Sequence, residues 1–123
     1  MNEGNNLYEK SYQFAVRVIN GYKYLSKEKR EFIISKQLLK SGTSIGANVS
    51  EANGAISKND FSNKISLAYK ESLETKYWLN LLKDTSYIDE KTFNSMHEQC
   101  DELSKILFSI LENTRIKSSS DVY

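Results

Sequence analysis

The chain of 123 residues lacks proline and has a single cysteine, a single histidine and a single tryptophan. Because proline interrupts helices, its absence is typical of a chain made of long helices. One cysteine cannot form an internal disulfide, and no charged start is followed by an apolar segment, so we expect a cytoplasmic protein without a secretory signal. The longest apolar runs have three residues, as at 32–34 and 106–108, which predicts no membrane span and no membrane partner.

The composition is that of a folded domain. Hydrophobic residues make up 39% and charged residues 27% of the sequence, which is unlike a disordered chain. The length suits one domain with one core. We therefore expect a single domain over residues 7–117, a frayed N-terminus at 1–6 and a disordered C-terminal tail at 118–123, because both ends are polar.

Apolar residues recur every three or four positions throughout residues 7–117, and no stretch alternates as a strand does. The pattern predicts helices over about 7–25 and 27–53, and two more that begin after the N-caps Ser57 and Asp89. Short connections make successive helices antiparallel, so the predicted fold is all-α, an up-down-up-down antiparallel four-helix bundle. The residues expected in its core include Leu38, Ile45, Ile65, Leu79, Leu103 and Leu107.

Several small residues lie within or beside the second predicted helix. Ser26 is its expected N-cap, and Gly54 is the expected left-handed residue that ends it. Gly42 and Gly46 lie four residues apart on one helix face, where the lack of side chains lets a neighbouring helix approach closely. The segment follows no strand and lacks the Gly-Lys-Ser/Thr ending of a phosphate-binding loop.

Residue types that support catalysis or bind metals are sparse. His97 lies three residues before Cys100 and therefore on the same helix face, as a Cys–His dyad requires. We favour the alternative, in which Cys100 fills the core and His97 lies at its edge, because no third orienting group is evident. Zinc would need four ligands, and the residue three before His97 is Asn94 rather than the glutamate of a di-iron bundle. We expect no catalytic residue, no metal and no cofactor.

The spacing of three glutamates is compatible with acid–base chemistry. Glu71 and Glu74 lie one turn apart on the third predicted helix, and Glu51 lies near the end of the second. Paired carboxylates can exchange protons with a substrate. Such residues are more often solvated or hydrogen-bonded between helices, and we favour this structural role.

Charge is unevenly distributed although the formal net charge is only +1. Residues 1–50 carry a net charge of +4, and residues 51–123 carry −3. Within 23–40 six cations outnumber two glutamates, and those near the expected start of the second helix face the positive end of its dipole. Cations placed against a local preference indicate phosphate binding, and no obvious aromatic platform accompanies them for stacking on bases. The six are Lys23, Lys27, Lys29, Arg30, Lys36 and Lys40.

The third predicted helix is apolar over a wider arc than one bundle interior needs. Beside a seam of small residues it carries Tyr69, Leu73 and Tyr77 on one flank and Trp78 on the other. Excess apolar and aromatic surface marks an interface with a partner. Because most soluble oligomers are homomeric, we expect these four residues to contact another copy of the chain.

Three sequence segments carry a resemblance to a known family. Residues 38–52 read LLKSGTSIGANVSEA, residues 68–75 read AYKESLET and residues 77–82 read YWLNLL. These segments resemble the signature of small four-helix-bundle proteins encoded in intervening sequences of bacterial 23S ribosomal RNA genes. The likeness covers nearly the whole of residues 7–117. Related proteins include the accessory variability protein of diversity-generating retroelements, which works beside a reverse transcriptase.

The resemblance implies a non-enzymatic bundle that assembles into a homopentameric ring, and the retroelement relatives imply binding of RNA or DNA through basic surface. The sequence departs from the signature at Lys40, where arginine is expected, and at residues 53–55, which lack a basic residue after the glycine. The matching polar signature positions, which we interpret as structural, are Ser44, Asn48, Glu51 and Glu74.

Two hypotheses about function follow. In the first, an oligomer binds nucleic acid through the six cations. In the second, the protein is an interaction scaffold without nucleic-acid contact, and the cations are a solvated face that Asp84, Asp89 and Glu90 neutralise. The sequence pI of 7.7, well below that of strongly basic domains, favours the second. Salt dependence of RNA binding distinguishes them, because phosphate contacts release counterions.

Overall fold

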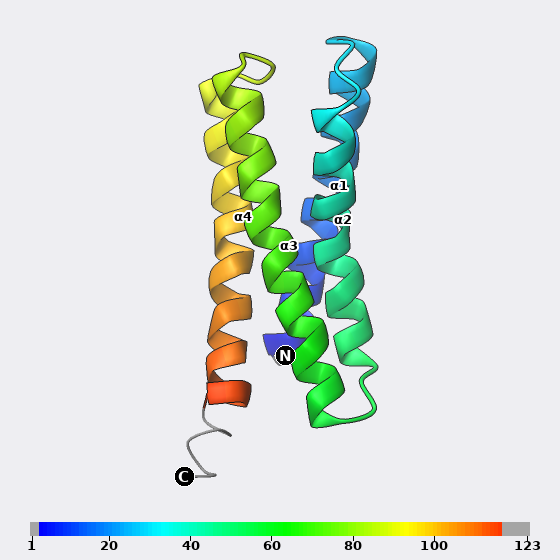
Figure 1. Ribbon diagram of the computed structural model, residues 1–123, viewed down its shortest axis with the longest axis vertical. Helices are drawn as coiled ribbons and strands as arrows, with labels where there is room; N and C mark the ends of the chain where they lie inside the picture. Colours follow the sequence, from blue (N-terminus) through cyan, green and yellow to red (C-terminus); the bar gives the residue numbers. More distant parts are fainter. Residues whose placement is uncertain (1–2, 117–123) are drawn as a thin grey trace.

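The computed structural model describes residues 3–116, with the side chains of residues 6–114. These residues form four α-helices joined by short connections (Figure 1). The last helix continues into a π-helical turn over Glu112–Ile116. The helices are α1 (Glu3–Lys27), α2 (Ile34–Asn53), α3 (Lys58–Asp84) and α4 (Glu90–Leu111).

Successive helices run antiparallel, which confirms the predicted up-down-up-down bundle (Figure 1). α2 packs on α1 and on α3, and α3 packs on α4, whereas α1 and α4 contact each other much less. Two α-helical hairpins therefore meet mainly through α2 and α3. We call the end with the connections 28–33 and 85–89 the upper end, as drawn in Figure 1, and the end with the connection 54–57 the lower end.

The core runs along the bundle and is mostly apolar. The hydroxyl oxygens of Ser41 and Thr75 lie 3.0 Å apart between α2 and α3, and those of Ser72 and Ser104 lie 2.7 Å apart between α3 and α4. Because these buried hydroxyls pair with each other, the small residues let the helices approach without leaving a polar group unsatisfied. All six residues predicted for the core are buried: Leu38, Ile45, Ile65, Leu79, Leu103 and Leu107.

The two glycines in the middle of α2 lie against α1. A Cβ atom at Gly42 would be 2.8 Å from both γ-carbons of Val18. A Cβ atom at Gly46 would be 3.4 Å from the carbonyl and hydroxyl oxygens of Ser11. The close approach predicted from the glycine spacing is confirmed, and the neighbour is α1.

The connection between α1 and α2 differs from the prediction. α1 continues through Lys27, so Ser26 is not an N-cap, and its hydroxyl donates to a carbonyl oxygen of its own helix at 2.8 Å. α2 begins only at Ile34. The buried carboxylate of Glu31 accepts hydrogen bonds from the backbone N–H groups of residues 33–35 at 3.2, 3.1 and 2.7 Å. Glu31 thereby supplies the hydrogen bonds that an N-cap side chain would otherwise make.

The other predicted helix ends are mostly confirmed. The Ser57 hydroxyl accepts from the N–H of Asp60 at 3.0 Å, and the Asp60 carboxylate accepts from an N–H just before α3 at 3.1 Å. The carboxylate of Asp89 accepts from an N–H in the first turn of α4 at 2.7 Å. Gly54 ends α2 as predicted, but its φ of −101° is not left-handed, so the predicted conformation is wrong.

The expected domain ends fall near the limits of the described residues. α1 begins at Glu3, inside the stretch expected to be frayed, and the expected tail at 118–123 lies outside the described residues. Across the part of the chain that the structure describes, no helix combines the length and the apolar character needed to cross a membrane.

Candidate functional site

The six cations singled out in the sequence are all exposed and lie near the upper end. Lys27 ends α1, Lys29 and Arg30 lie in the connection, and α2 begins shortly afterwards. At about 1.5 Å per helical residue, Lys23 is about 6 Å from the end of α1 and Lys40 is about 9 Å from the start of α2. We call this set the basic end patch, which consists of Lys23, Lys27, Lys29, Arg30, Lys36 and Lys40.

The basic end patch is not held by salt bridges. None of its cations forms an ion pair with another residue that the structure describes. Lys27 lies in the last turn of α1, where the helix dipole favours a cation, and Lys29 and Arg30 precede α2. The predicted conflict with the dipole of the second helix is therefore wrong for Lys27, but it holds for Lys36, which lies in the first turn of α2. Exposure and the lack of ion pairs also characterise the patch.

Carboxylates lie beside two members of the patch. Lys29 shares a groove of about 650 Å³ with Asp89 and Glu90 of the α3–α4 side. Burial raises the pKa of the Glu71 carboxyl, and the charge of Lys40 partly opposes this rise. The upper end is therefore mixed in charge, with cations concentrated on the α1–α2 connection and acidic groups next to it.

An apolar surface on α3 and α4 includes three of the four predicted interface residues. The rings of Tyr69 and Phe108 pack with centroids 5.7 Å apart. Leu73 and Tyr77 continue the same side of α3, and 43% and 57% of their surfaces are exposed. A shallow groove of about 320 Å³ runs between the two helices beside Leu73 and Phe108. We call this surface the α3–α4 face, formed by Tyr69, Leu73, Tyr77 and Phe108.

A second apolar surface, which the sequence analysis missed, runs along α1. Tyr8, Tyr12, Val16 and Ile19 are exposed, and their spacing of four, four and three residues places them on one side of the helix. The rings of Tyr8 and Tyr12 have centroids 6.1 Å apart. We call these four residues the α1 face. A second periodic stripe in the sequence of α1 was the signal that could have revealed it.

Three of the polar signature positions lie along α2. The Ser44 hydroxyl donates to a carbonyl oxygen one turn earlier at 2.7 Å, and the Asn48 amide donates to the Ser44 carbonyl oxygen at 2.9 Å. The carboxylate of Glu51 lies 3.0 Å from the ammonium of Lys64, which links α2 to α3. All three residues therefore contact other residues of the same chain, as the structural interpretation of the signature expects.

The fourth signature position, Glu74, lies on α3. Its carboxylate accepts a hydrogen bond from the indole nitrogen of Trp78 at 3.1 Å. The Trp78 ring in turn packs edge-on against Tyr77, with centroids 4.9 Å apart. Trp78 is half-buried, as Tyr69 is, and it borders the α3–α4 face through its contact with Tyr77.

The family model of the 23S rRNA-intervening sequence protein matches residues 3–109 of this chain. The chain belongs to this family. A solved structure of a protein of unknown function from the S23 ribosomal protein family of Bacteroides thetaiotaomicron VPI-5482 is 48% identical to it. That likeness covers 90% of this chain and 99% of the other, with a TM-score of 0.89. No curated protein matches this chain.

Neither comparison indicates an enzyme, because the family description names no reaction and the similar solved structure is of a protein of unknown function. The Cys100 thiol is buried and donates to the Ser72 carbonyl oxygen at 3.3 Å. Burial raises the pKa of Cys100 to about 12, so the thiol stays protonated at neutral pH. The ring of His97 packs against Phe93 instead. Among the described residues, no three His, Cys, Asp or Glu side chains are grouped to hold a metal.

A polar network joins α4 to its neighbours in this family member. Lys10 of α1 lies 3.2 Å from Glu102. Asp101 lies 2.7 Å from Lys76 of α3 and 3.0 Å from Lys105. The hydrogen bonds from Lys76 and then Lys105 lower the pKa of Asp101 to about 2, so this carboxylate is ionised throughout the neutral range.

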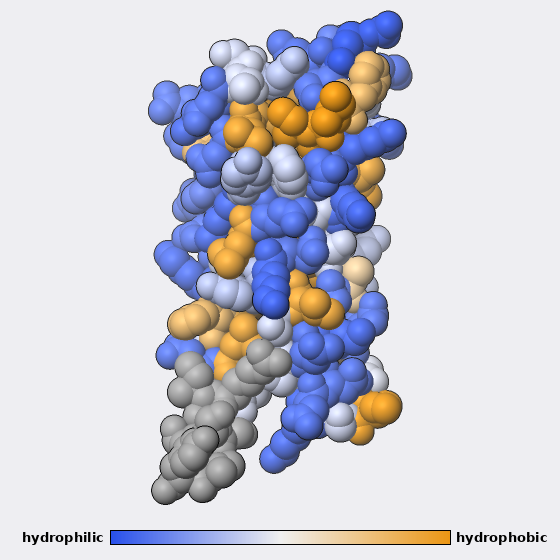
Figure 2. Space-filling view, viewed as in Figure 1, coloured by the Kyte–Doolittle hydropathy of each residue, from blue (hydrophilic) through white to orange (hydrophobic). Residues whose placement is uncertain are grey.

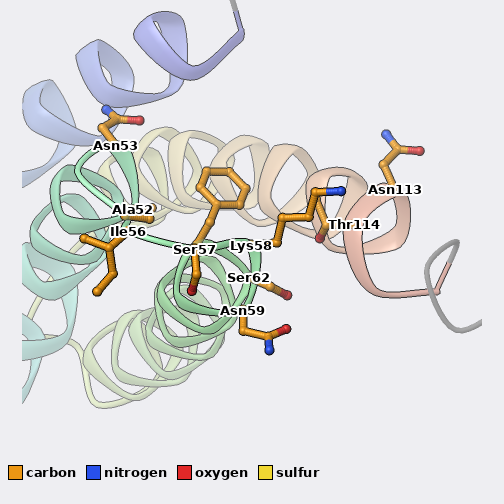
Figure 3. Close-up of a pocket in the computed structure, with 11 residues that line it drawn as sticks. Ala52, Asn53, Ile56, Ser57, Lys58, Asn59, Ser62, Asn113 and Thr114 are labelled. Atoms are coloured by element: carbon orange, nitrogen blue, oxygen red, sulfur yellow. The ribbon is translucent and has the colours of Figure 1, made fainter.

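A groove of about 1020 Å³ lies at the lower end, far from the basic end patch. Figure 3 shows that its residues come from the end of α2, the start of α3 and the turn after α4. Ile56 is 93% exposed there, and the buried Ser62 hydroxyl has no hydrogen-bond partner among the described residues. Lys58 is the one charged residue among the described groups that line it. The groove therefore offers no pair of groups for acid–base or nucleophilic chemistry.

Proposed function

We propose that this protein is a non-enzymatic homo-oligomer that binds RNA or DNA through the basic end patch. The observation that carries the proposal is the gathering of six exposed cations within about 10 Å of one end of the bundle. Such a surface attracts phosphates, because each cation that neutralises a phosphate releases a counterion.

We further propose that copies assemble head to tail into a closed ring of five. The α1 face and the α3–α4 face are different surfaces, so a contact between them would be heterologous, and repeated heterologous contacts form a ring when the rotation closes. We infer that the exposed rings of Tyr8 and Tyr12 contact the apolar part of the shallow groove, at Leu73 and Phe108. The groove is also lined by Lys76, Asp101, Lys105 and Glu112. The number of five rests on the family resemblance rather than on this geometry.

The ring would change how strongly the basic end patch binds. One protomer offers only the six cations of the basic end patch, and Asp89 and Glu90 beside Lys29 repel phosphates. We therefore expect weak binding per copy. A ring presents one patch per subunit to a long strand, and multivalency can raise the avidity by roughly 10²–10⁴ when several subunits engage together. Long RNA should therefore bind far more tightly than short RNA.

Fluorescence anisotropy with long and short RNA at two salt concentrations tests the proposal. Reversing Lys29, Arg30 and Lys36 to glutamate should abolish binding without changing the oligomer, and added salt should weaken binding steeply. A matched comparison reverses Lys29 and Lys36 in one variant and Lys58 and Lys70 in another, since both pairs are exposed and change the net charge equally. The second pair lies outside the patch and should weaken binding much less.

The second candidate function is a protein-interaction scaffold without nucleic-acid contact. The observation that favours it is the mixed charge of the upper end, where Asp89 and Glu90 lie in one groove with Lys29. In that case the parent binds RNA no better than the triple reversal variant does, and the patch is only a solvated face. The two apolar faces would then be the surfaces available to copies of the chain and to protein partners.

A further inference from the structure

Three apolar side chains are exposed at the upper end beside the basic end patch. The exposed fractions are 50% for Phe32, 77% for Ile33 and 48% for Tyr24. Figure 2 shows hydrophobic side chains gathered near this end and bordered by hydrophilic ones. Exposed aromatic rings therefore lie beside the six cations, where the sequence showed no obvious platform for stacking on bases.

The fold does not use the ring of Phe32. Glu31 turns inward to cap α2, and the next two residues are exposed before the helix begins. An apolar residue just before an N-cap often packs against the fourth residue of its helix. The N-cap of α2 is Ile33, so the fourth residue is Gln37, which is polar and exposed. Phe32 therefore lacks the apolar partner that this position normally provides.

Exposed cations flank Phe32 on both sides. Lys29 and Arg30 precede it in the connection, and Lys36 follows it in α2. Arg30 has a φ of 55°, the left-handed conformation that commonly ends a helix, and the N–H of Glu31 donates back to the Leu25 carbonyl oxygen at 3.0 Å. A charged and exposed side chain therefore lies at the turn of the connection, two residues before Phe32.

From this combination we propose that the basic end patch recognises single strands. An unpaired base stacks on the exposed ring of Phe32, while the neighbouring phosphates contact Arg30 and Lys36. Proteins that bind single-stranded nucleic acid combine aromatic platforms with cationic surface in this way. In a duplex the faces of the bases are covered by neighbouring pairs, so the ring adds affinity for single strands alone. The inference rests on the proposed function and adds the class of nucleic acid.

Nearby acidic residues make Tyr24 a poorer stacking platform than Phe32. Tyr24 lines the groove that also contains Asp89 and Glu90, and these carboxylates repel phosphates. They also oppose a flat anionic lipid surface, which would cover the whole upper end, whereas a strand can pass over Phe32 without crossing them. We therefore assign the stacking platform to Phe32.

Anisotropy with labelled RNA of about 15 nucleotides, single-stranded or as a duplex, tests the assignment on the full chain. Phe32→Leu keeps an apolar side chain and removes the ring. We expect it to lower the affinity for the single strand roughly fivefold or more and to leave duplex affinity unchanged. Phe32→Tyr restores a ring and should bind within about twofold of the parent, as should Tyr24→Leu. Circular dichroism and light scattering verify that each variant folds and assembles like the parent.

The outcomes separate this inference from the proposed function. If Phe32→Leu binds the single strand as well as the parent does, or if Tyr24→Leu is the variant that weakens, Phe32 is not the platform although the patch still binds phosphates. If the parent binds neither RNA, both proposals are overturned. Binding of the parent to phosphatidylglycerol vesicles that Phe32→Leu abolishes, without a ring-dependent effect on RNA, assigns the surface to lipid and overturns the inference.

Discussion

Gly42 of α2 lies directly against Val18 of α1, with no room between them for a side chain. A Cβ atom at Gly42 would be 2.8 Å from both γ-carbons of Val18, which is fully buried. Valine is stiff about χ1 because it branches at Cβ, so it cannot rotate away from an added methyl group. The contact therefore sets how closely the first two helices approach.

Gly42→Ala should lower the free energy of unfolding by about 1–3 kcal/mol, because the added methyl group overpacks the contact with Val18. Gly21 provides the matched control, since it lies within α1 and nothing is within 4 Å of its Cβ position. Gly21→Ala should raise the free energy of unfolding by about 0.5–1 kcal/mol through helix propensity. Urea denaturation followed by circular dichroism measures both changes.

Adding Val18→Ala to Gly42→Ala tests the same contact from the other side. The double variant should lose less stability than the sum of the two single variants, because the smaller side chain removes the clash. If Gly42→Ala proves as stabilising as Gly21→Ala, the two helices are not in the close contact described.

Leu79→Ala should lower the free energy of unfolding by about 2–5 kcal/mol, because it leaves a cavity in the core. Leu79 is fully buried on α3. Leu67 on the same helix is 39% exposed, and Leu67→Ala should change stability by less than about 0.5 kcal/mol. Thermal or urea denaturation of the two variants compares them directly, and similar losses at both positions would mean that α3 presents a different side to the core.

The core could be predicted from the sequence, whereas the first connection and the outer side of α1 could not. The three- and four-residue spacing of the apolar residues around Leu38 and Leu79 was sufficient to assign both leucines to the core. In α1 two apolar stripes interleave, and periodicity alone does not decide which of them faces the core, so the exposed stripe that includes Ile19 was missed. The start of α2 was misplaced because Glu31 caps it from outside the usual N-cap position, while Ser26 matched the expected residue type.

The basic end patch, too, could be predicted from the sequence only in part. Its six members were identified from charge alone, but their exposure and the position of Phe32 beside Arg30 depend on where α2 begins. A helix that started at residue 27 would have enclosed Phe32 in a regular turn. The stacking platform therefore became visible only once the cap at Glu31 was known.

Asp101→Asn should lower stability at neutral pH and have no effect in strong acid. The hydrogen bonds from Lys76 and Lys105 lower the pKa of Asp101 from its ordinary value of 3.8 to about 2 in the folded protein. The unfolded chain therefore binds more protons between these pH values, and the stabilisation by Asp101 is complete above about pH 4 and lost as the pH falls toward 2. We expect a difference of at most about 1 kcal/mol at pH 7, since the pair is partly exposed.

Urea denaturation of the parent and of Asp101→Asn at several pH values between 7 and about 2 measures this dependence. Glu98→Gln is the matched control, because Glu98 lies exposed on the same helix and forms no ion pair among the described residues. A difference between parent and Asp101→Asn that persists unchanged at the lowest pH would show that the loss comes from packing rather than from the ion pairs.

The proposed ring predicts that two different surfaces of one copy are each required for assembly. Tyr12 lies on the α1 face and Tyr77 on the α3–α4 face, with 58% and 57% of their surfaces exposed. Because both side chains are outside the core, Tyr12→Glu and Tyr77→Glu should each leave the helical content unchanged. Each should nevertheless break the oligomer, since a carboxylate would be buried against an apolar surface. Light scattering on each purified variant measures the loss of the oligomer.

Mixing the two variants distinguishes a head-to-tail contact from a symmetric one. A Tyr12→Glu copy keeps an intact α3–α4 face, and a Tyr77→Glu copy keeps an intact α1 face, so one good contact can form between them. The mixture should therefore yield dimers of one copy of each variant, which cannot grow into a ring because the remaining faces both carry glutamate. Analytical ultracentrifugation of the separate and mixed variants resolves monomers from dimers. If Tyr12→Glu alone assembles like the parent, the α1 face lies outside the interface, and an α3–α4 face paired with its own copy becomes the symmetric alternative.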